Sequence, residues 1–257
     1  MSWQSITARD NPKLQHLRKL AQDGGAYRKL GGVWLEGDHL ARAAVQRGVT
    51  PALALITDVA AADESLRALA DVAPKVLVVS PALFKTVSGL ESPAQIGFEL
   101  ALPAQPRIEA QADSVVLDRL QDAGNVGTIL RSAAALGFRQ VLALKGTAAL
   151  WSPKVLRAGM GAHFGLRLIE GLGVEDLDAL KVPLLATSSH ADAMLHQADL
   201  PSPCGWVMGH EGQGVSEALM RRCALRIGIP QPGGEESLNV ASAASICLYE
   251  SARRRLG

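Results

Sequence analysis

Short apolar segments alternate with segments of helical periodicity along nearly the whole chain, and this alternation restricts the possible folds most. In the first third it predicts strands at 32–36, 52–57, 75–79 and 96–100, with helices at 11–22, 39–47 and 64–70. From residue 114 it predicts strands at 114–118, 140–144, 166–169, 183–187, 205–208 and 225–229, with helices at about 125–136, 152–160, 174–180, 216–222 and 240–253. Apolar strands between Gly/Pro loops and helices indicate an α/β fold, whose second part is a mostly parallel sheet covered on both faces.

The polar, Pro-containing stretch 102–113 separates the two series of strands. A chain of 257 residues with 48% hydrophobic residues is long enough for two modest domains, each with its own core. We therefore expect an N-terminal domain at 1–105, a linker at 106–112 and a C-terminal domain at 113–257.

Composition argues against several classes of protein. No apolar run approaches the roughly 20 residues of a membrane helix, and the first ten residues lack the apolar core of a signal peptide, so we expect a cytoplasmic protein with no membrane partner. Cys204, Cys223 and Cys247 have no metal-ligand spacing, and the six histidines show no ligand pairing. The sequence therefore predicts inert buried thiols and no metal site.

The formal net charge of +1 gives no whole-protein field that would attract nucleic acid. A local patch is available in an N-terminal run of basic residues, Arg9, Lys13, Arg18, Lys19, Arg28 and Lys29. This run is either the solvated face of an amphipathic helix or an RNA-binding surface. Aromatic residues make up only 4% of the chain, which disfavours a base-stacking platform.

Three polar loops, at 117–131, 207–216 and 229–239, follow predicted strands, and ligands of parallel sheets bind at the carboxyl ends of strands. The glycines of Gly209-His-Glu-Gly-Gln-Gly214 permit close approach of the backbone to a ligand. Ser237 and Asn239 stand at a loop-to-helix entry, where free N–H groups converge. Taken singly, each loop is explained by a plain turn or a helix cap.

Taken together, the loops resemble the three motifs of the SpoU (TrmH) family of S-adenosylmethionine-dependent RNA ribose 2'-O-methyltransferases, in the SPOUT superfamily. The motifs are Asn125-Val-Gly-Thr-Ile-Leu-Arg131, Met208-Gly-His-Glu-Gly-Gln-Gly214, and Ile229-Pro with Ser237-Leu-Asn-Val-Ala-Ser-Ala243. The segment Ser152–Ala162 matches an intermediate signature. The resemblance is strong over about 113–255 and looser over the first 105 residues, and Ala241 stands where the family usually has serine.

The resemblance implies an N-terminal α/β substrate-binding domain and a C-terminal SPOUT α/β domain with a deep trefoil knot, which periodicity alone would not suggest. It also implies that Gly209, Ile229 and Leu238, with Ser237 in the same loop, contact S-adenosylmethionine. Family members are dimers, so a homodimer through the C-terminal domain is expected.

Arg131 is the catalytic candidate that the resemblance implies. A guanidinium with a pKa above about 12 is a poor base, so we expect Arg131 to bind an RNA phosphate and to stabilise developing alkoxide charge. Asn125, Glu211 and Asn239 would orient the arginine and the ribose, Glu211 either by pairing with Arg131 or through backbone contacts. His210 is expected to be a solvent-facing spacer.

The resulting hypothesis is a ribose 2'-O-methyltransferase of ribosomal RNA, because the extra N-terminal domain is typical of rRNA-directed members. The alternatives are a transfer RNA 2'-O-methyltransferase and a catalytically silent RNA-binding module of the same fold. Intact Asn125, Arg131, Glu211 and Asn239 argue against the silent module. A Rossmann-type nucleotide enzyme is a further rival.

Overall fold

The structure is a computed structural model that describes residues 2–188, 191–234 and 237–256. The chain packs as two compact units, Met1–Ala104 with Trp151–Phe164, and Gln105–Leu150 with Gly165–Gly257. The segment Trp151–Phe164, expected in the second domain, packs with the first unit. Residues 106–112, expected as a linker, form no helix or strand but are bonded to the second unit. The Glu109 N–H, for example, donates to Gln140 Oε1 at 2.7 Å.

The first unit is built on a five-stranded mixed sheet in the order β1-β4-β3-β5-β2. Its strands are β1 (Ser2–Ser5), β2 (Gly32–Glu36), β3 (Leu53–Thr57), β4 (Lys75–Val79) and β5 (Ile96–Ala101). Strand β5 runs antiparallel to both β2 and β3, whereas β1, β4 and β3 are parallel. Strand β1 is missing from the sequence-based prediction because its four residues are mostly exposed and carry no apolar alternation.

The helices of the first unit follow the expected pattern, with two additional α-helices and two short 3-10 segments. They are α1 (Pro12–Gln22), α2 (Ala26–Leu30), α3 (Asp38–Gln46), η1 (Ala60–Ala62), α4 (Glu64–Ala70), α5 (Pro81–Val87) and α7 (Pro153–Gly159), with η2 (Ala162–Gly165) after α7. The predicted apolar stripe of α1, Leu14, Leu17, Leu20 and Ala21, is buried. Helices α2 and α5 are additions, although α5 carries a start signal, since Ser80 caps it and Pro81 opens it.

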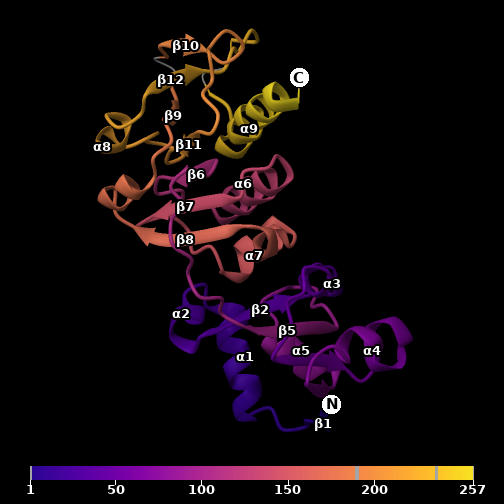
Figure 1. Cartoon of the computed structure of the whole chain (residues 1–257). Coiled ribbons are helices and arrows are strands. Elements are labelled where there is room, and N and C mark those ends of the chain that lie inside the picture. The colour runs from indigo at the N-terminus through magenta and orange to yellow at the C-terminus, as the bar shows by residue number, and fades with distance from the viewer. Residues whose placement is uncertain (1, 189–190, 235–236, 257) are drawn as a thin grey trace. The chain divides into compact units, whose positions relative to one another are not determined.

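The second unit contains a seven-stranded sheet in the order β10-β12-β9-β11-β6-β7-β8 (Figure 1). Its strands are β6 (Ser114–Leu117), β7 (Gln140–Leu144), β8 (Arg167–Leu172), β9 (Leu184–Thr187), β10 (Ala193–Met194), β11 (Gly205–Met208) and β12 (Leu225–Gly228). Every pair of neighbouring strands in the described residues is parallel, so the prediction of a mostly parallel sheet is confirmed.

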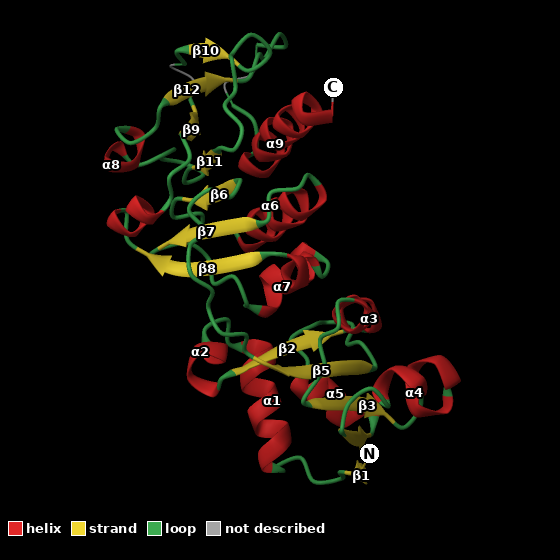
Figure 2. Ribbon diagram, viewed as in Figure 1, coloured by secondary structure: helices red, strands yellow, loops and turns green. Residues whose placement is uncertain are grey.

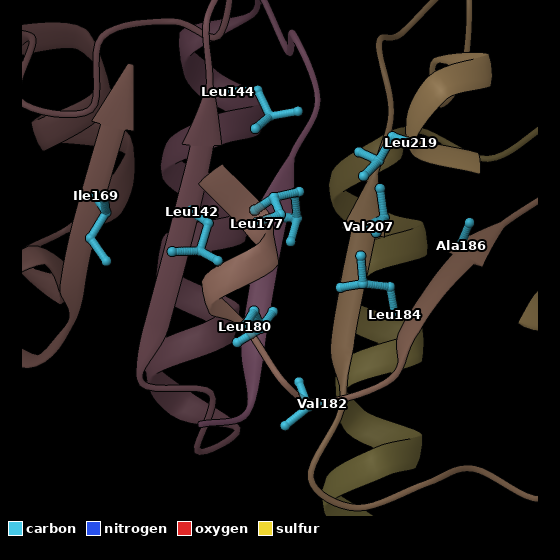
Figure 3. Close-up of a cluster of buried hydrophobic side chains, with 11 residues drawn as sticks. Leu142, Leu144, Ile169, Leu177, Leu180, Val182, Leu184, Ala186, Val207 and Leu219 are labelled. Atoms are coloured by element: carbon cyan, nitrogen blue, oxygen red, sulfur yellow. The ribbon is translucent and has the colours of Figure 1, made fainter. Parts of the chain in front are cut away.

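Helical segments cover both faces of this sheet (Figure 2). They are α6 (Ala123–Ala135), η3 (Glu175–Ala179), α8 (Glu217–Met220) and α9 (Val240–Leu256). Leu177 of η3 and Leu219 of α8 join the inward side chains of the strands in one buried cluster, which Figure 3 shows. The segment predicted as a helix at 174–180 contains a short 3-10 helix instead, in which Leu177 is buried. None of the described helices is long and apolar enough to cross a membrane.

The last segment of the chain crosses the sheet before it ends. Strand β12 lies near one edge, yet α9 packs chiefly on α6 and β11. The Trp206 Nε1 donates to Ser251 Oγ at 2.9 Å in a buried contact, and the hydroxyls of Ser132 and Ser245 lie 2.8 Å apart between α6 and α9. This crossing brings the start of α9 beside the start of α6. Threading of the segment through an earlier loop, the trefoil knot, stays a prediction of the resemblance.

Candidate active site

A cavity of about 550 Å³ opens at the carboxyl ends of β9, β11 and β12. Its size lies within the range of small-molecule sites. It is lined by Thr187, Ser188, Met194, Gly209, His210, Glu211, Gly214, Val215, Ile227, Gly228, Ile229, Pro230, Gln231, Ser237, Leu238, Asn239, Val240 and Ala243. The structure thus brings together all four residues predicted to bind the cofactor.

Gly209 is at this position because the loop leaves no room for a side chain. A Cβ on Gly209 would lie 2.2 Å from the Val215 nitrogen and 2.3 Å from the Gly214 carbonyl carbon. The backbone of this loop therefore forms the wall of the cavity, while Ile229 and Leu238 supply apolar surface to it. The cavity fits a ligand with polar and apolar parts.

The loop from Gly209 to Val215, which we call the motif-2 loop, is closed on itself. The His210 N–H donates to Gly214 O at 3.0 Å, and the Gly214 N–H returns a bond to His210 O at 2.8 Å. The ring nitrogen His210 Nδ1 accepts the N–H groups of Gly212 and Gln213 at 3.0 and 3.2 Å. The expectation of a solvent-facing spacer is therefore wrong: His210 is half-buried, lines the cavity and holds the turn.

Three side chains, one from each predicted motif, form a continuous chain of hydrogen bonds. Asn239 Nδ2 donates to Asn125 Oδ1 at 3.0 Å, and Asn125 Nδ2 donates to Glu211 Oε1 at 3.3 Å. Glu211 also accepts the backbone N–H groups of Asp122 at 3.1 Å and Gln121 at 3.3 Å. Of the two contacts expected for Glu211, the one with backbone is present.

The position of Asn125 differs from the expected one. Helix α6 begins at Ala123, with the Asp122 carboxylate as its N-cap accepting the Asn125 N–H at 2.7 Å. Asn125 therefore lies in the first helical turn, and its side chain is available to Glu211 and Asn239. At the start of α9, Asn239 both caps the helix and joins the network. Its Oδ1 accepts the N–H groups of Ala241 and Ser242 at 2.9 and 3.3 Å, while its Nδ2 bonds Asn125.

The electrostatics of Glu211 favour the charged carboxylate. Burial by itself raises its pKa, but the N–H donors, including the Asn125 amide and the backbone of Asp122 and Gln121, outweigh burial and hold the pKa below its ordinary value. At neutral pH a charged acceptor thus joins the start of α6 to the motif-2 loop.

Arg131 stands apart from this network. It is exposed on α6 and does not line the cavity, and its side chain forms no ion pair or hydrogen bond with another described residue. The guanidinium is therefore available to a partner from solution, whereas Asn125, Glu211 and Asn239 are already bonded to one another.

Sequence reasoning missed part of the cavity wall, namely Thr187 at the end of β9, Ser188 after it and Met194 in β10. Strand β9 lies between β11 and β12 in the sheet, which strand order along the chain does not reveal. The segment after β9 is held to β12 by a two-pronged ion pair, in which Arg226 Nε and Nη2 lie 3.0 and 2.7 Å from the carboxylate oxygens of Asp192.

No group of three metal-ligating side chains comes together within 2–188, 191–234 and 237–256. Burial raises the pKa of the Cys204 and Cys247 thiols to about 12 and that of Cys223 to about 11. Such thiols stay protonated and are poor metal ligands and nucleophiles.

A parallel sheet with a glycine-walled cavity at its carboxyl ends, beside a bonded polar network, defines an α/β enzyme that binds a small organic cofactor. Residues 113–249 match the SpoU rRNA Methylase family, and the chain belongs to that family. The family predicted from the motifs is confirmed.

Two relatives and a solved structure match most of the chain. It is 32% identical over 267 residues to an uncharacterized tRNA/rRNA methyltransferase of Synechocystis, covering 98% of this chain and 94% of that protein. It is 30% identical over 220 residues to the 23S rRNA (guanosine(2553)-2'-O)-methyltransferase RlmP of Bacillus subtilis, covering 84% and 86%. The crystal structure of the SpoU methyltransferase AviRb from Streptomyces viridochromogenes, in complex with AdoMet, matches with a TM-score of 0.86 at 25% identity, covering 96% of this chain and 99% of that one.

Proposed function

We propose that this chain transfers a methyl group from S-adenosylmethionine to a ribose 2'-hydroxyl of ribosomal RNA. The observation that carries the proposal is the chain of bonds from Asn239 through Asn125 to Glu211, which joins all three motifs beside the cavity. RlmP, named for the same reaction on 23S rRNA, supports the substrate. The enzyme class and cofactor predicted from the sequence are those of this family. Because ribosomal RNA is found in the cytoplasm, we propose that the protein is cytoplasmic.

The cavity residues fit the cofactor. Gly209 has no side chain, so the loop backbone itself can form the wall of the cavity. Ile229 and Leu238 offer apolar contact, and Ser237 adds a hydroxyl to the lining. S-adenosylmethionine, when bound, supplies an electrophilic methyl group. Positioning of a ribose oxygen for in-line attack can contribute about 7–11 kcal/mol to such a reaction, so fixed geometry around the cavity is the main catalytic resource.

Arg131 is proposed to bind an RNA phosphate and to stabilise charge that develops on the ribose oxygen. Its exposure and its lack of a partner among the described residues support this role, because a guanidinium held in an internal ion pair would have to break it first. Asn125 and Asn239 would orient the ribose, and Glu211 would hold Asn125 in place.

Tritium transfer from labelled S-adenosylmethionine to RNA, followed by nuclease digestion, tests the reaction. Label on a base instead of a 2'-oxygen would contradict it, and 2'-O-methylation mapped on rRNA with and without the gene would identify the nucleotide.

Arg131→Ala should abolish turnover while cofactor affinity, measured by calorimetry, stays within about threefold, a difference of under 1 kcal/mol. Titration with NAD in the same calorimeter tests the Rossmann-type rival.

The silent RNA-binding module makes a different prediction, namely RNA affinity without label transfer. Transfer to tRNA but not to rRNA would favour the other alternative. We retain rRNA because the relatives that match most of this chain include a 23S rRNA enzyme.

We further propose that the first unit, with its basic N-terminal run, supplies RNA affinity. Three residues of the run have internal partners. Arg18 donates to Thr86, with Nε 2.7 Å from its carbonyl oxygen, and Lys13 Nζ lies 3.4 Å from Glu99. The Arg28 guanidinium lies over the Tyr27 ring, 4.9 Å from its centroid. Lys19 and Lys29 are exposed and remain candidates.

Affinity for RNA falls as salt rises. Each lost phosphate contact should make the plot of log affinity against log salt concentration less steep by about 0.9 on duplex RNA, if the value for duplex DNA applies. Lys19→Glu with Lys29→Glu tests this, and Lys85→Glu, an exposed lysine of the same unit outside the run, is the control. Equal salt slopes in all three proteins would identify the run as a solvated helix face.

A homodimer through the second unit is also proposed. Exposed apolar side chains on one side of α9 support it, with Ile246 39% and Tyr249 58% exposed. Light scattering after gel filtration should give twice the chain mass, and Tyr249→Glu should give the monomer. A wild-type monomer at micromolar concentration would contradict the proposal.

A further inference from the structure

Asp118 holds both ends of the motif-2 loop. It follows β6 directly and is 1% exposed. Its backbone N–H donates at 2.8 Å to the carbonyl oxygen of Met208, the residue before the loop. Its Oδ2 accepts at 2.6 Å the N–H of Ser216, the residue after the loop. One buried carboxylate residue therefore fixes where the loop leaves the sheet and where it returns.

Arg119 extends this hold to the tip of the loop. Its Nε donates to Asp118 Oδ1 at 2.9 Å, and its Nη1 donates to Gln213 Oε1 at 3.1 Å. Its backbone N–H donates to Thr147 Oγ1 at 3.1 Å, and a Cβ on Gly146 would lie 3.3 Å from Arg119 Cγ. Arg119 thus contacts the loops that follow three neighbouring strands, β6, β7 and β11.

The backbone of Arg119 is strained, with φ at +59°. This left-handed region disfavours every residue with a Cβ, and glycine occupies it most easily. Burial by itself raises the pKa of Asp118, but hydrogen bonds from Arg119 and Ser216 outweigh it and lower the pKa, so the carboxylate is charged. An arginine at a position suited to glycine indicates that its side chain has a role that offsets the strain.

We propose that Arg119 is a positioning residue of the methyl-transfer site, which fixes the motif-2 loop through Gln213 and Asp118. The loop carries Gly209, the cavity wall, and Glu211, which holds Asn125. Arg119 does not itself line the cavity. This inference rests on the proposed function, since it assigns to Arg119 the geometry of that site.

The decisive variant is Arg119→Gly, because it removes the side chain that bonds Gln213 and Asp118 and also relieves the backbone strain. The same change also leaves the buried Asp118 carboxylate without its guanidinium partner, which offsets the gain from strain relief, so we expect a folded protein with a Tm within about 4 °C of the wild type. The Kd for S-adenosylmethionine should rise about tenfold and kcat should fall. If the role were purely structural, weaker binding would only accompany a loss of Tm, and a change at the exposed Gln213 would affect neither. Gln213→Ala should reproduce the weaker binding, whereas Gln213→Glu, which keeps an acceptor for Arg119, should retain wild-type affinity.

The double variant Arg119→Gly with Gln213→Ala should bind the cofactor no more weakly than Arg119→Gly alone, because both changes break one contact. Circular dichroism confirms that each variant is folded. A Kd and a kcat for Arg119→Gly within twofold of wild type would overturn the inference while leaving the methyltransferase activity intact. Wild-type protein that neither binds S-adenosylmethionine nor labels RNA would instead refute the proposed function.

Discussion

Asn239 serves two purposes, and a pair of substitutions separates them. Its Oδ1 caps α9 through the N–H groups of Ala241 and Ser242, and its Nδ2 bonds Asn125. Loss of an N-cap costs about 1 kcal/mol, and a net hydrogen bond contributes about 0.5–1.5 kcal/mol, near the low end for exposed groups. Asn239→Ala should therefore lower the free energy of unfolding by about 1.5–2 kcal/mol, or the Tm by about 3–8 °C.

Asn239→Asp is the matched control for stability. Aspartate caps helices as well as asparagine does, and its charge suits a helix N-terminus. It cannot donate to Asn125 Oδ1, however, and it adds a negative charge to the network that contains Glu211. We expect stability within about 0.5 kcal/mol of wild type, with methyl transfer reduced at least about tenfold, or 1.4 kcal/mol in the barrier.

Urea unfolding followed by circular dichroism measures the first effect, and tritium transfer to RNA measures the second. An Asn239→Asp protein as active as the wild type would refute the assignment of the amide to the site. An Asn239→Ala protein of unchanged stability would refute the cap.

Three further changes test the surroundings of the site. Gly209→Ala should weaken cofactor binding at least about tenfold, because a Cβ there would lie 2.2 Å from a backbone nitrogen of the same loop. Gly233→Ala is the control, because a Cβ there meets nothing within 4 Å, and it should leave the affinity for the cofactor, measured by calorimetry, unchanged. Equal losses of affinity in the two variants would contradict the reasoning. Because the pKa of Glu211 is lowered, its contribution to stability is complete above about pH 4.3, where the unfolded chain titrates, and is lost as the pH falls through the lower folded value. The difference in unfolding free energy between wild type and Glu211→Gln, measured by urea unfolding, should therefore shrink from pH 7 to pH 3. A difference that stays constant over this range would argue against the prediction. Trp206→Phe leaves the hydroxyl of Ser251 without its buried donor and should cost about 1–3 kcal/mol; a loss below about 0.5 kcal/mol in urea unfolding would count against this contact.

The local features of the fold were predictable because they depend on neighbouring residues. The stripe of α1 repeats at helical spacing, and the apolar strands of the second unit stand between glycines and prolines. The motif residues Asn125, Glu211 and Asn239 were identified through the resemblance of the three loops to the family's motifs, and their hydrogen bonds now give a physical reason for grouping them.

Other features depend on which strands become neighbours. The cavity wall at Thr187 and Met194 exists because β9 and β10 flank β12. The role of His210 depends on a turn that returns its own Nδ1 to the loop backbone. No periodicity in the sequence encodes either contact, since each is fixed by hydrogen bonds that form only when the loop is folded.

By itself, then, the sequence determined the α/β class, the family and the residues of the three motifs, because apolar alternation and motif spacing are local properties of the chain. The tertiary structure alone decided that α9 returns across the sheet to α6, that the three motifs share one network, and that Arg119 occupies a strained position between three loops. The physical reason is that strand order and loop contacts arise from pairings between residues roughly 30 to more than 100 positions apart. Their free energy is realised only in the folded chain.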